Sequence, residues 1–312
     1  MSVGKLRGVL SPVLTPFNTD RSVSETRFLK HCQSLLAQNV GLAIFGTNSE
    51  ANSLSVEEKM RLLDYLVDAG VPGDRMMPGT GCCALPDSIA LTRHAVQRGC
   101  AGVLMLPPFY YKGVSDEGLF RNYAAIIDAV ADSRLKIYLY HIPPVAQVGI
   151  SMGLIERLLK AYPGTIAGIK DSSGDWSNTK AMLDTFQPEG FDVFAGSETF
   201  LLQTLRNGGA GCITATGNVN AAAISQLHAT WQQDDADAQQ AALDAVRAAF
   251  QAHPMIAAMK HAIAWQSGDD AWKVMRPPLQ ELSQEQAAKL ESDLTALKFS
   301  IPNAASLSGV AA

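Results

Sequence analysis

The stretch Ile166-Ala-Gly-Ile-Lys170-Asp-Ser-Ser-Gly174 joins a strand pattern to a turn pattern, with a lysine between them. Its first residues are apolar and partly β-branched, which is typical of a short strand buried on both faces. The residues after Lys170 have the composition of a turn. Desolvation lowers the pKa of a lysine amine, and a Schiff-base nucleophile requires a free amine near neutral pH. The alternatives are a lysine that reaches the surface or one that pairs with Asp171.

Composition indicates an ordinary globular chain. Of its 312 residues, 47% are hydrophobic and 18% are charged, and a single α/β barrel needs about 250 residues. The formal net charge of −5 gives no reason to expect a nucleic acid or a membrane as partner. There is no apolar run of about 18 residues and no secretory-signal pattern at the start, so we expect a cytoplasmic protein.

The five cysteines show neither Cys-x-x-Cys nor Cys/His ligand spacing. We therefore expect small, buried and reduced side chains and no metal site. A redox-active Cys82–Cys83 pair is the alternative. The cysteines are Cys32, Cys82, Cys83, Cys100 and Cys212.

Strand-like and helical patterns alternate eight times along the chain. The strand-like runs lie at residues 8–17, 40–47, 75–80, 102–107, 136–142, 165–170, 192–196 and 211–216. The helical patterns that follow them cover residues 22–38, 55–68, 86–98, 116–130, 152–161, 176–186, 199–207 and 220–233. Strands separated by helices run parallel, and eight such units predict an α/β fold of the (β/α)₈ TIM-barrel type.

An open doubly wound sheet is the competing fold, but it would carry a Gly-rich turn after its first strand, which is absent here. The same absence argues against a nucleotide-dependent oxidoreductase. Helical patterns continue at residues 235–252, 255–265 and 284–297. We therefore expect a barrel over residues 1–233, a C-terminal helical extension packed on it over residues 234–300, and a flexible tail over residues 301–312.

The carboxyl ends of barrel strands are where such folds place their chemistry. In this chain they are rich in hydroxyls, phenols and glycines, without a His and carboxylate cluster that would hold a metal. These ends carry Gly46-Thr-Asn-Ser-Glu50, Pro107-Pro-Phe-Tyr-Tyr111, Tyr138-Leu-Tyr-His-Ile-Pro143, Lys170-Asp-Ser-Ser173, Gly196-Ser-Glu198 and Thr216-Gly-Asn218.

In order and spacing, these motifs resemble the dihydrodipicolinate synthase / N-acetylneuraminate lyase family of pyruvate-dependent class I aldolases. The resemblance extends over residues 8–302 and rests mainly on Gly46-Thr-Asn-Ser-Glu50, Tyr140-His-Ile-Pro143 and Gly168-Ile-Lys-Asp-Ser172. It implies that Lys170 forms an imine with pyruvate or another 2-oxo acid and that no metal or organic cofactor is needed. The imine then acts as the electron sink for making or breaking a carbon–carbon bond.

The resemblance also assigns a proton relay. Tyr140 is expected to move the proton, Thr47 to pass it on, and Tyr110 to reach in from a neighbouring subunit, with Tyr111 left open as the alternative. A phenol is a poor base by itself, so it needs such neighbours. For these aromatic residues, packing at the barrel rim is the other interpretation. A relay completed across subunits implies a homotetramer built as a dimer of dimers.

Substrate contacts are expected on both sides of the lysine. The 2-oxo acid carboxylate is expected near Thr47, Asn48 and Ser49, on backbone N–H groups and hydroxyls. Asn48 and Ser49 depart from the Thr-Gly usual in the family, and Ser49 requires a turn without positive φ at that position. Further candidates for substrate contact are His141, Gly196, Ser197 and Glu198, although Glu198 is also a favourable helix-start residue.

The run after Tyr140 contains no arginine, whereas dihydrodipicolinate synthases usually carry one there for the carboxylate of the second substrate. The sequence therefore favours a Schiff-base lyase or aldolase of the N-acetylneuraminate-lyase or sugar-acid type, acting on a 2-oxo acid and an aldehyde. Dihydrodipicolinate synthase itself and a 2-oxo acid dehydratase or deaminase remain alternatives. A catalytically silent 2-oxo acid binding protein is the non-enzyme alternative.

Overall fold

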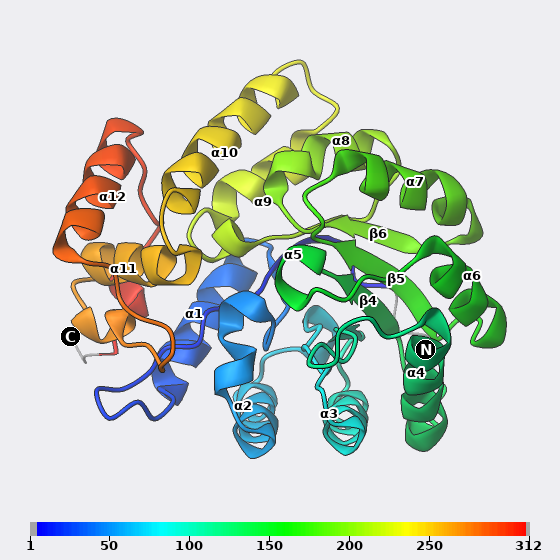
Figure 1. Ribbon diagram of the computed structural model, residues 1–312. Coiled ribbons are helices and arrows are strands. Elements are labelled where there is room, and N and C mark those ends of the chain that lie inside the picture. Colours follow the sequence, from blue (N-terminus) through cyan, green and yellow to red (C-terminus); the bar gives the residue numbers. More distant parts are fainter. Residues whose placement is uncertain (1–4, 310–312) are drawn as a thin grey trace.

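The computed structural model describes residues 5–309 and contains one sheet of parallel strands in the order β2-β1-β7-β6-β5-β4-β3. Helices cover the outside of this sheet, and further helices lie at one side of it (Figure 1). The strands are β1 (Gly8–Ser11), β2 (Gly41–Leu42), β3 (Val103–Met105), β4 (Ile137–His141), β5 (Ile166–Asp171), β6 (Asp192–Ala195) and β7 (Gly211–Ile213).

The segment predicted as the third strand closes the sheet into a barrel, between β2 and β3. Met76 forms a parallel bridge with Leu42, and Gly79 forms one with Leu104. The N–H of Leu104 donates to the Pro78 carbonyl at 2.9 Å. Pro78 has no N–H to give, so the ladder is interrupted and two bridges replace a continuous strand. The (β/α)₈ barrel is thus confirmed, with two isolated bridges in place of a strand at one position.

The barrel helices follow the predicted segments closely, and several begin at a serine. Ser55 shows the pattern best, because its hydroxyl accepts from the Glu58 N–H while its own N–H donates to the Glu58 carboxylate. These helices are α1 (Glu25–Ala37), α2 (Val56–Asp68), α3 (Leu85–Gln97), α4 (Asp116–Val130), α6 (Met152–Ala161), α7 (Trp176–Phe186), α8 (Leu201–Arg206) and α9 (Ala221–Thr230). A short helix that the sequence did not predict, α5 (Pro143–Ala146), follows β4.

Two layers of buried side chains surround the strands. The inner layer fills the barrel itself and includes Leu10, Tyr138, Phe194 and Ile213. The outer layer fills the space between strands and helices. The period-2 alternation of the strands separates the two layers. A side chain on the inner face near the end of a strand therefore faces the barrel mouth.

The C-terminal appendage consists of α10 (Ala236–Gln251), α11 (Met255–Ser267) and α12 (Gln284–Ala296), which lie together beside the barrel (Figure 1). Its core joins that of the barrel through Leu14 and Val219, which pack in one cluster with Phe250 and Met259. Helix α11 is buried along most of its length. The appendage is therefore held against the barrel by a shared apolar core.

The end of the chain differs from the expected flexible tail. Ile301 and Leu307 are buried in the core of the appendage, and the Trp272 indole N–H donates to the Leu307 carbonyl at 3.0 Å. Residues 301–309 are therefore packed, because two apolar side chains among small residues are enough to anchor the segment. The rest of the predicted tail, residues 310–312, lies outside the described residues. Within residues 5–309, no helix is both long and apolar enough to cross a membrane.

Candidate active site

Lys170 lies near the carboxyl end of β5 and lines a cavity of about 380 Å³ at the barrel mouth. The residue is only 2% exposed, so the surface alternative does not hold. Asp171 does not pair with it either, because that carboxylate accepts from the Thr179 hydroxyl at 2.7 Å and the Asn178 amide at 3.1 Å. Among the described residues, no carboxylate lies within ion-pair distance of the Lys170 amine.

Gly168 lies two residues before Lys170 in β5, on the same face of the strand, and its lack of a side chain makes room for this arrangement. A Cβ at this position would lie 2.3 Å from the Asp192 carbonyl oxygen and 2.8 Å from the Tyr138 ring. Both contacts are far inside van der Waals range, so any side chain here would push β5 away from its neighbours. The Gly-Ile-Lys order is thus required by the packing that places Lys170.

Tyr140 is paired in register with Lys170 across the β4–β5 ladder. Its ring centroid lies 4.2 Å from the Lys170 amine nitrogen, and its hydroxyl is 3.2 Å from the Thr47 hydroxyl. Either hydroxyl can donate in this hydrogen bond. The three predicted residues Lys170, Tyr140 and Thr47 therefore lie together on the wall of one cavity.

The loop that carries Thr47 is a single 3-10 turn, Thr47–Ser49, between two residues with left-handed backbone, Phe45 (φ 61°) and Glu50 (φ 55°). Ser49 does not have a positive φ, in agreement with the expectation that a residue with a side chain avoids that conformation here. Its hydroxyl accepts from the Gly46 N–H at 3.1 Å, and Ser49 is fully buried. The Ser49 side chain therefore holds the loop.

Thr47 and Asn48 form the part of this loop that faces the cavity. Their backbone N–H groups have no hydrogen-bond partner among residues 5–309, because the turn uses only the N–H groups that follow them. Such open N–H groups at the start of a turn can donate hydrogen bonds to an anionic group.

The residues after β6 have different roles. Gly196 and Ser197 line the cavity, whereas Glu198 is fully buried below it. The Glu198 carboxylate accepts from the hydroxyls of Thr214 and Thr216 and pairs with Arg247 at 2.7 Å. Its oxygens are thus occupied by protein groups.

His141 follows Tyr140 and points to the opposite side of β4. Its Nδ1 accepts from the Ile150 N–H at 2.9 Å, and the ring is not part of the cavity wall. Burial lowers the pKa of His141, while the neighbouring Asp171 opposes that shift. The ring therefore stabilises the loop over residues 142–150 in this arrangement.

Three cavity residues come from the appendage, a placement which the sequence does not predict, because the strand ends alone mark the barrel mouth in the sequence. Arg247 and Gln251 lie four residues apart on one face of α10, and Met255 begins α11. Nη1 of Arg247 bonds Glu198 and Thr214, while its Nε and Nη2 have no partner among the described residues. A lone arginine and glutamine at helical spacing were the available signal.

Tyr110 and Tyr111 are the most exposed aromatic residues of the described chain, at 74% and 73%. Their rings make an edge contact with each other at 5.3 Å and do not line the cavity of their own chain. The assignment of Tyr110 to the relay, with Tyr111 as its alternative, therefore stays a prediction about a neighbouring subunit.

No group of three or more His, Cys, Asp or Glu side chains is arranged to hold a metal ion within the described part of the chain. All five cysteines are unpaired, including Cys82 and Cys83. The polar residues of the cavity wall thus carry an amine, a phenol, hydroxyls, amides, one guanidinium and the carboxylate of Asp171.

Comparisons with known proteins agree with this geometry. A model of the dihydrodipicolinate synthetase family matches residues 5–297. An uncharacterized DapA-like lyase of Chloroflexus aurantiacus is 36% identical over 290 residues, which is 92% of this chain and 95% of that protein.

Two crystal structures superpose on nearly the whole chain. Dihydrodipicolinate synthase from Agrobacterium tumefaciens gives a TM-score of 0.86 at 28% identity, covering 94% of this chain and 99% of that one. YagE from E. coli K12, solved in complex with pyruvate, gives 0.85 at 27% identity, covering 95% and 100%. With a family model matched almost from end to end and the same barrel in these relatives, the chain belongs to the dihydrodipicolinate synthetase family.

Proposed function

We propose that the protein is a Schiff-base-forming lyase or aldolase that acts on pyruvate or another 2-oxo acid. The observation that carries the proposal is Lys170, a buried amine without a carboxylate partner among the described residues, 4.2 Å from the ring of Tyr140 in an open cavity. The amine has the position of a nucleophile, on the wall of a cavity that can admit a 2-oxo acid.

In the reaction, the Lys170 amine attacks the C2 carbonyl of the 2-oxo acid, and loss of water gives a protonated imine. In the cleavage direction, Tyr140 takes the proton of the C4 hydroxyl, and the C3–C4 electron pair moves toward the imine nitrogen. An aldehyde leaves and an enamine remains. The enamine is protonated at C3, and water then hydrolyses the imine to release the oxo acid and the free amine. Thr47 passes the proton from Tyr140 across its 3.2 Å hydrogen bond.

The substrate carboxylate would bind the open N–H groups of Thr47 and Asn48 on the loop that Ser49 stabilises. Gly196 and Ser197 would face the remainder of the substrate, together with Arg247 and Gln251 of α10. Glu198 would act indirectly by orienting Arg247, and His141 by supporting the loop beside it.

Among the activities that share the imine, we favour cleavage of a sugar-acid or sialic-acid type of substrate over dihydrodipicolinate synthesis. The supporting fact is the absence of arginine in the run after Tyr140. A 2-oxo acid dehydratase or deaminase uses the same first step, so product analysis must separate it from the aldolase. The non-enzyme alternative, a silent binding protein, would form the imine without turnover.

Borohydride reduction in the presence of pyruvate tests the proposal. We expect the protein to gain the mass of a reduced pyruvyl group on Lys170, located by peptide mass spectrometry, and Lys170→Ala to remain unmodified. Tyr140→Phe keeps the ring and loses the hydroxyl, so it should still trap pyruvate while turnover falls by about 10²- to 10⁴-fold. An unmodified wild-type protein would refute the proposal. Condensation of pyruvate with aspartate semialdehyde at a rate typical of enzymes would assign the synthase activity in its place.

The relay also predicts an oligomer, a homotetramer built from two dimers in which Tyr110 of one subunit approaches Thr47 of another. The exposure of Tyr110 within a single chain supports this arrangement. Sedimentation measurements should give a tetramer, and Tyr110→Phe should reduce turnover while Tyr111→Phe does not. A fully active monomer would contradict the arrangement.

A further inference from the structure

We propose that the appendage positions the carboxylate-binding loop, through a clamp formed by Glu50, Lys260 and Arg276. The clamp would hold the Thr47–Ser49 turn in the geometry in which its open N–H groups meet the 2-oxo acid. Lys260 and Arg276 would then be positioning residues of the active site, although neither lines the cavity. This inference rests on the function proposed above for Lys170 and its cavity.

Glu50 ends the carboxylate-binding loop in a strained conformation. Its φ and ψ are 55° and 35°, a left-handed backbone conformation that residues other than glycine seldom adopt. The next residues form another 3-10 turn, Ala51–Ser53, so the chain changes direction at Glu50. Such a residue keeps its conformation only when its surroundings hold it.

The first arm of the clamp is an ion pair between Glu50 and Lys260. The Lys260 amine contacts the Glu50 carboxylate, and both side chains are 0% exposed. The same amine donates to the Val274 carbonyl at 3.1 Å and lies 4.5 Å from the ring centroid of Phe17. The backbone N–H of Arg276 also donates to the Glu50 carboxylate and, like Lys260, stabilises its charge. The side chain of the loop residue is thus held by a helix 210 residues further along the chain.

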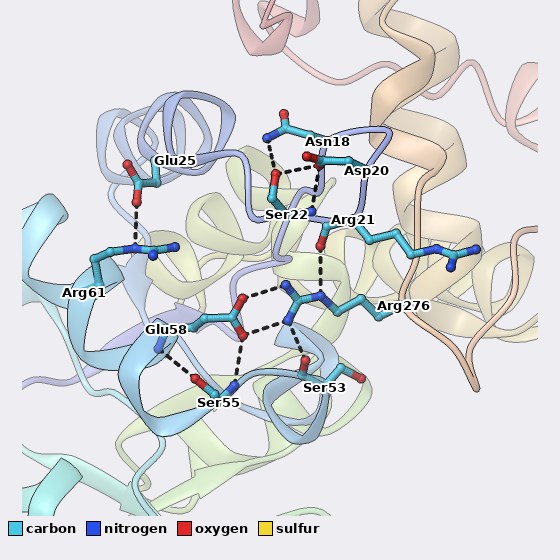
Figure 2. Close-up of polar contacts among 10 residues, drawn as sticks. All are labelled: Asn18, Asp20, Arg21, Ser22, Glu25, Ser53, Ser55, Glu58, Arg61 and Arg276. Carbon is cyan, nitrogen blue, oxygen red and sulfur yellow. Dashed lines mark hydrogen bonds and ion pairs between the residues drawn. The ribbon is translucent and has the colours of Figure 1, made fainter.

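The second arm is Arg276, which follows α11 and reaches the segment just after the loop (Figure 2). Its guanidinium forms two hydrogen bonds with the Glu58 carboxylate, at 2.6 and 2.8 Å, and donates to the Ser53 carbonyl at 2.7 Å. It also donates to the Arg21 carbonyl at 3.0 Å. A planar guanidinium with four directed bonds fixes orientation as well as distance.

Phe17 joins the two arms. Its ring, fully buried, lies 4.5 Å from the Lys260 amine and 4.7 Å from the Arg276 guanidinium. Two cations on one aromatic ring are held in a fixed relation to each other, since each is attracted to the ring face. The two arms therefore contact the loop region at Glu50, just before the 3-10 turn Ala51–Ser53, and at Ser53, the last residue of that turn.

A second ion pair ties the appendage to the barrel away from the loop and provides a matched control. Arg27 of α1 bonds Asp269 at 2.8 Å, with side chains 13% and 4% exposed. It resembles the Glu50–Lys260 pair in burial and in joining the same two parts of the chain. It contacts no residue of the segment 46–53. If the appendage merely added stability, loss of either pair would have the same effect on substrate binding.

The test measures the pyruvate concentration that gives half-maximal borohydride trapping. In the variant Glu50→Gln with Lys260→Met, both charges are removed and the side-chain volumes are nearly kept. We expect half-saturation to rise at least tenfold, with the same modified fraction at saturating pyruvate. In the control Arg27→Met with Asp269→Asn, half-saturation should stay within twofold of the wild type, whatever the change in Tm. Arg276→Met leaves the buried pair in place and should raise half-saturation at least threefold.

An unchanged half-saturation in folded Glu50→Gln/Lys260→Met, or an equal rise in the control, would overturn the clamp. If the double variant does not fold, the Arg276→Met variant decides by the same criterion. Absence of trapping in the wild type refutes the proposed function instead, and it is recognised before any variant is compared.

Discussion

Two of the buried lysines of the described chain, Lys170 and Lys260, lie beside the same loop in different surroundings. Lys260 on α11 is 0% exposed and contacts the Glu50 carboxylate, whereas Lys170 on β5 is 2% exposed and has no carboxylate partner among residues 5–309. Lys260 points into packed protein, and Lys170 points into a cavity of about 380 Å³. A buried cation with a fixed partner supports structure, while a buried amine that faces open space is available for reaction.

The difference has an energetic basis. Removing an ammonium from water costs several kcal/mol, about as much as its attraction to a carboxylate returns. Burial raises the pKa of Glu50 and lowers the pKa of Lys260, and each charge opposes the shift of the other. Among residues 5–309, Lys170 has no carboxylate partner whose attraction would offset the cost of burying it, so this site lowers the stability of the fold where an amine must react.

The same substitution at the two lysines should give opposite results. Lys170→Met should abolish pyruvate trapping and turnover, a loss of at least about 10⁴-fold, because no other lysine of the described residues lines this cavity. Its free energy of unfolding should equal or exceed that of the wild type, since an unpaired buried amine is replaced by an apolar side chain of similar volume. Urea unfolding together with trapping checks both parts. A strongly destabilised Lys170→Met would show that the amine has a structural partner after all.

Lys260→Met should reduce the free energy of unfolding by about 3–5 kcal/mol, because Glu50 is left buried without a counter-ion. Adding Glu50→Gln should restore most of that loss, since the pair contributes little as a whole and its separated charges are what destabilise. Urea unfolding of the wild type, both single variants and the double variant completes the cycle. Additive effects of the two substitutions would contradict the ion pair.

The two lysines also differ in how far sequence could predict them. The sequence predicts the role of Lys170, because an apolar strand pattern ends at this residue and turn-forming residues follow it directly. Lys260 lies inside the helical run 255–265, which was predicted as a helix, but nothing local marks its partner 210 residues away. The same holds for Arg247, whose helix was predicted and whose place on the cavity wall was not. Local patterns give elements and strand ends, while contacts between distant elements depend on packing.

The fold shows the same division. Eight strand patterns predicted the barrel, and the segment that forms only isolated bridges contains Pro78, whose missing N–H is evident from the sequence. The packing of residues 301–309 could not be predicted from the sequence, because two apolar residues, Ile301 and Leu307, among small ones show little periodicity. Their burial depends on the core of the appendage, where the Trp272 indole N–H donates to the Leu307 carbonyl.

A third buried base extends the comparison to pH. His31 is 1% exposed, and burial lowers its pKa to about 4, while its hydrogen bond to Asn218 at 3.0 Å opposes the shift. In the unfolded chain the imidazole has a pKa near 6.5. The contribution of His31 to the free energy of unfolding is therefore complete above that pH and declines as the pH falls toward 4. Between pH 7 and 4.5 this amounts to about 2–3 kcal/mol.

His31→Gln isolates this contribution, because glutamine keeps an N–H donor for Asn218 and has no proton to gain. We expect the wild type to lose about 2–3 kcal/mol more than the variant between pH 7 and pH 4.5, since the carboxylates titrate equally in both. Urea unfolding at the two pH values gives the difference. Parallel pH profiles would mean that His31 has the same pKa in the folded protein as in the unfolded chain.

The smallest effect belongs to a lysine–carboxylate pair at the surface, Lys289–Asp293 on α12, with side chains 65% and 30% exposed. The pair has the same chemistry as Glu50–Lys260, but water solvates both charges in the folded and the unfolded chain. Its lysine also precedes its carboxylate along the helix, the weaker of the two orders. Lys289→Met should therefore change the free energy of unfolding by less than about 0.5 kcal/mol, and 1 M NaCl should remove the difference. A loss near that of Lys260→Met would show that burial is not what separates the lysines of this protein.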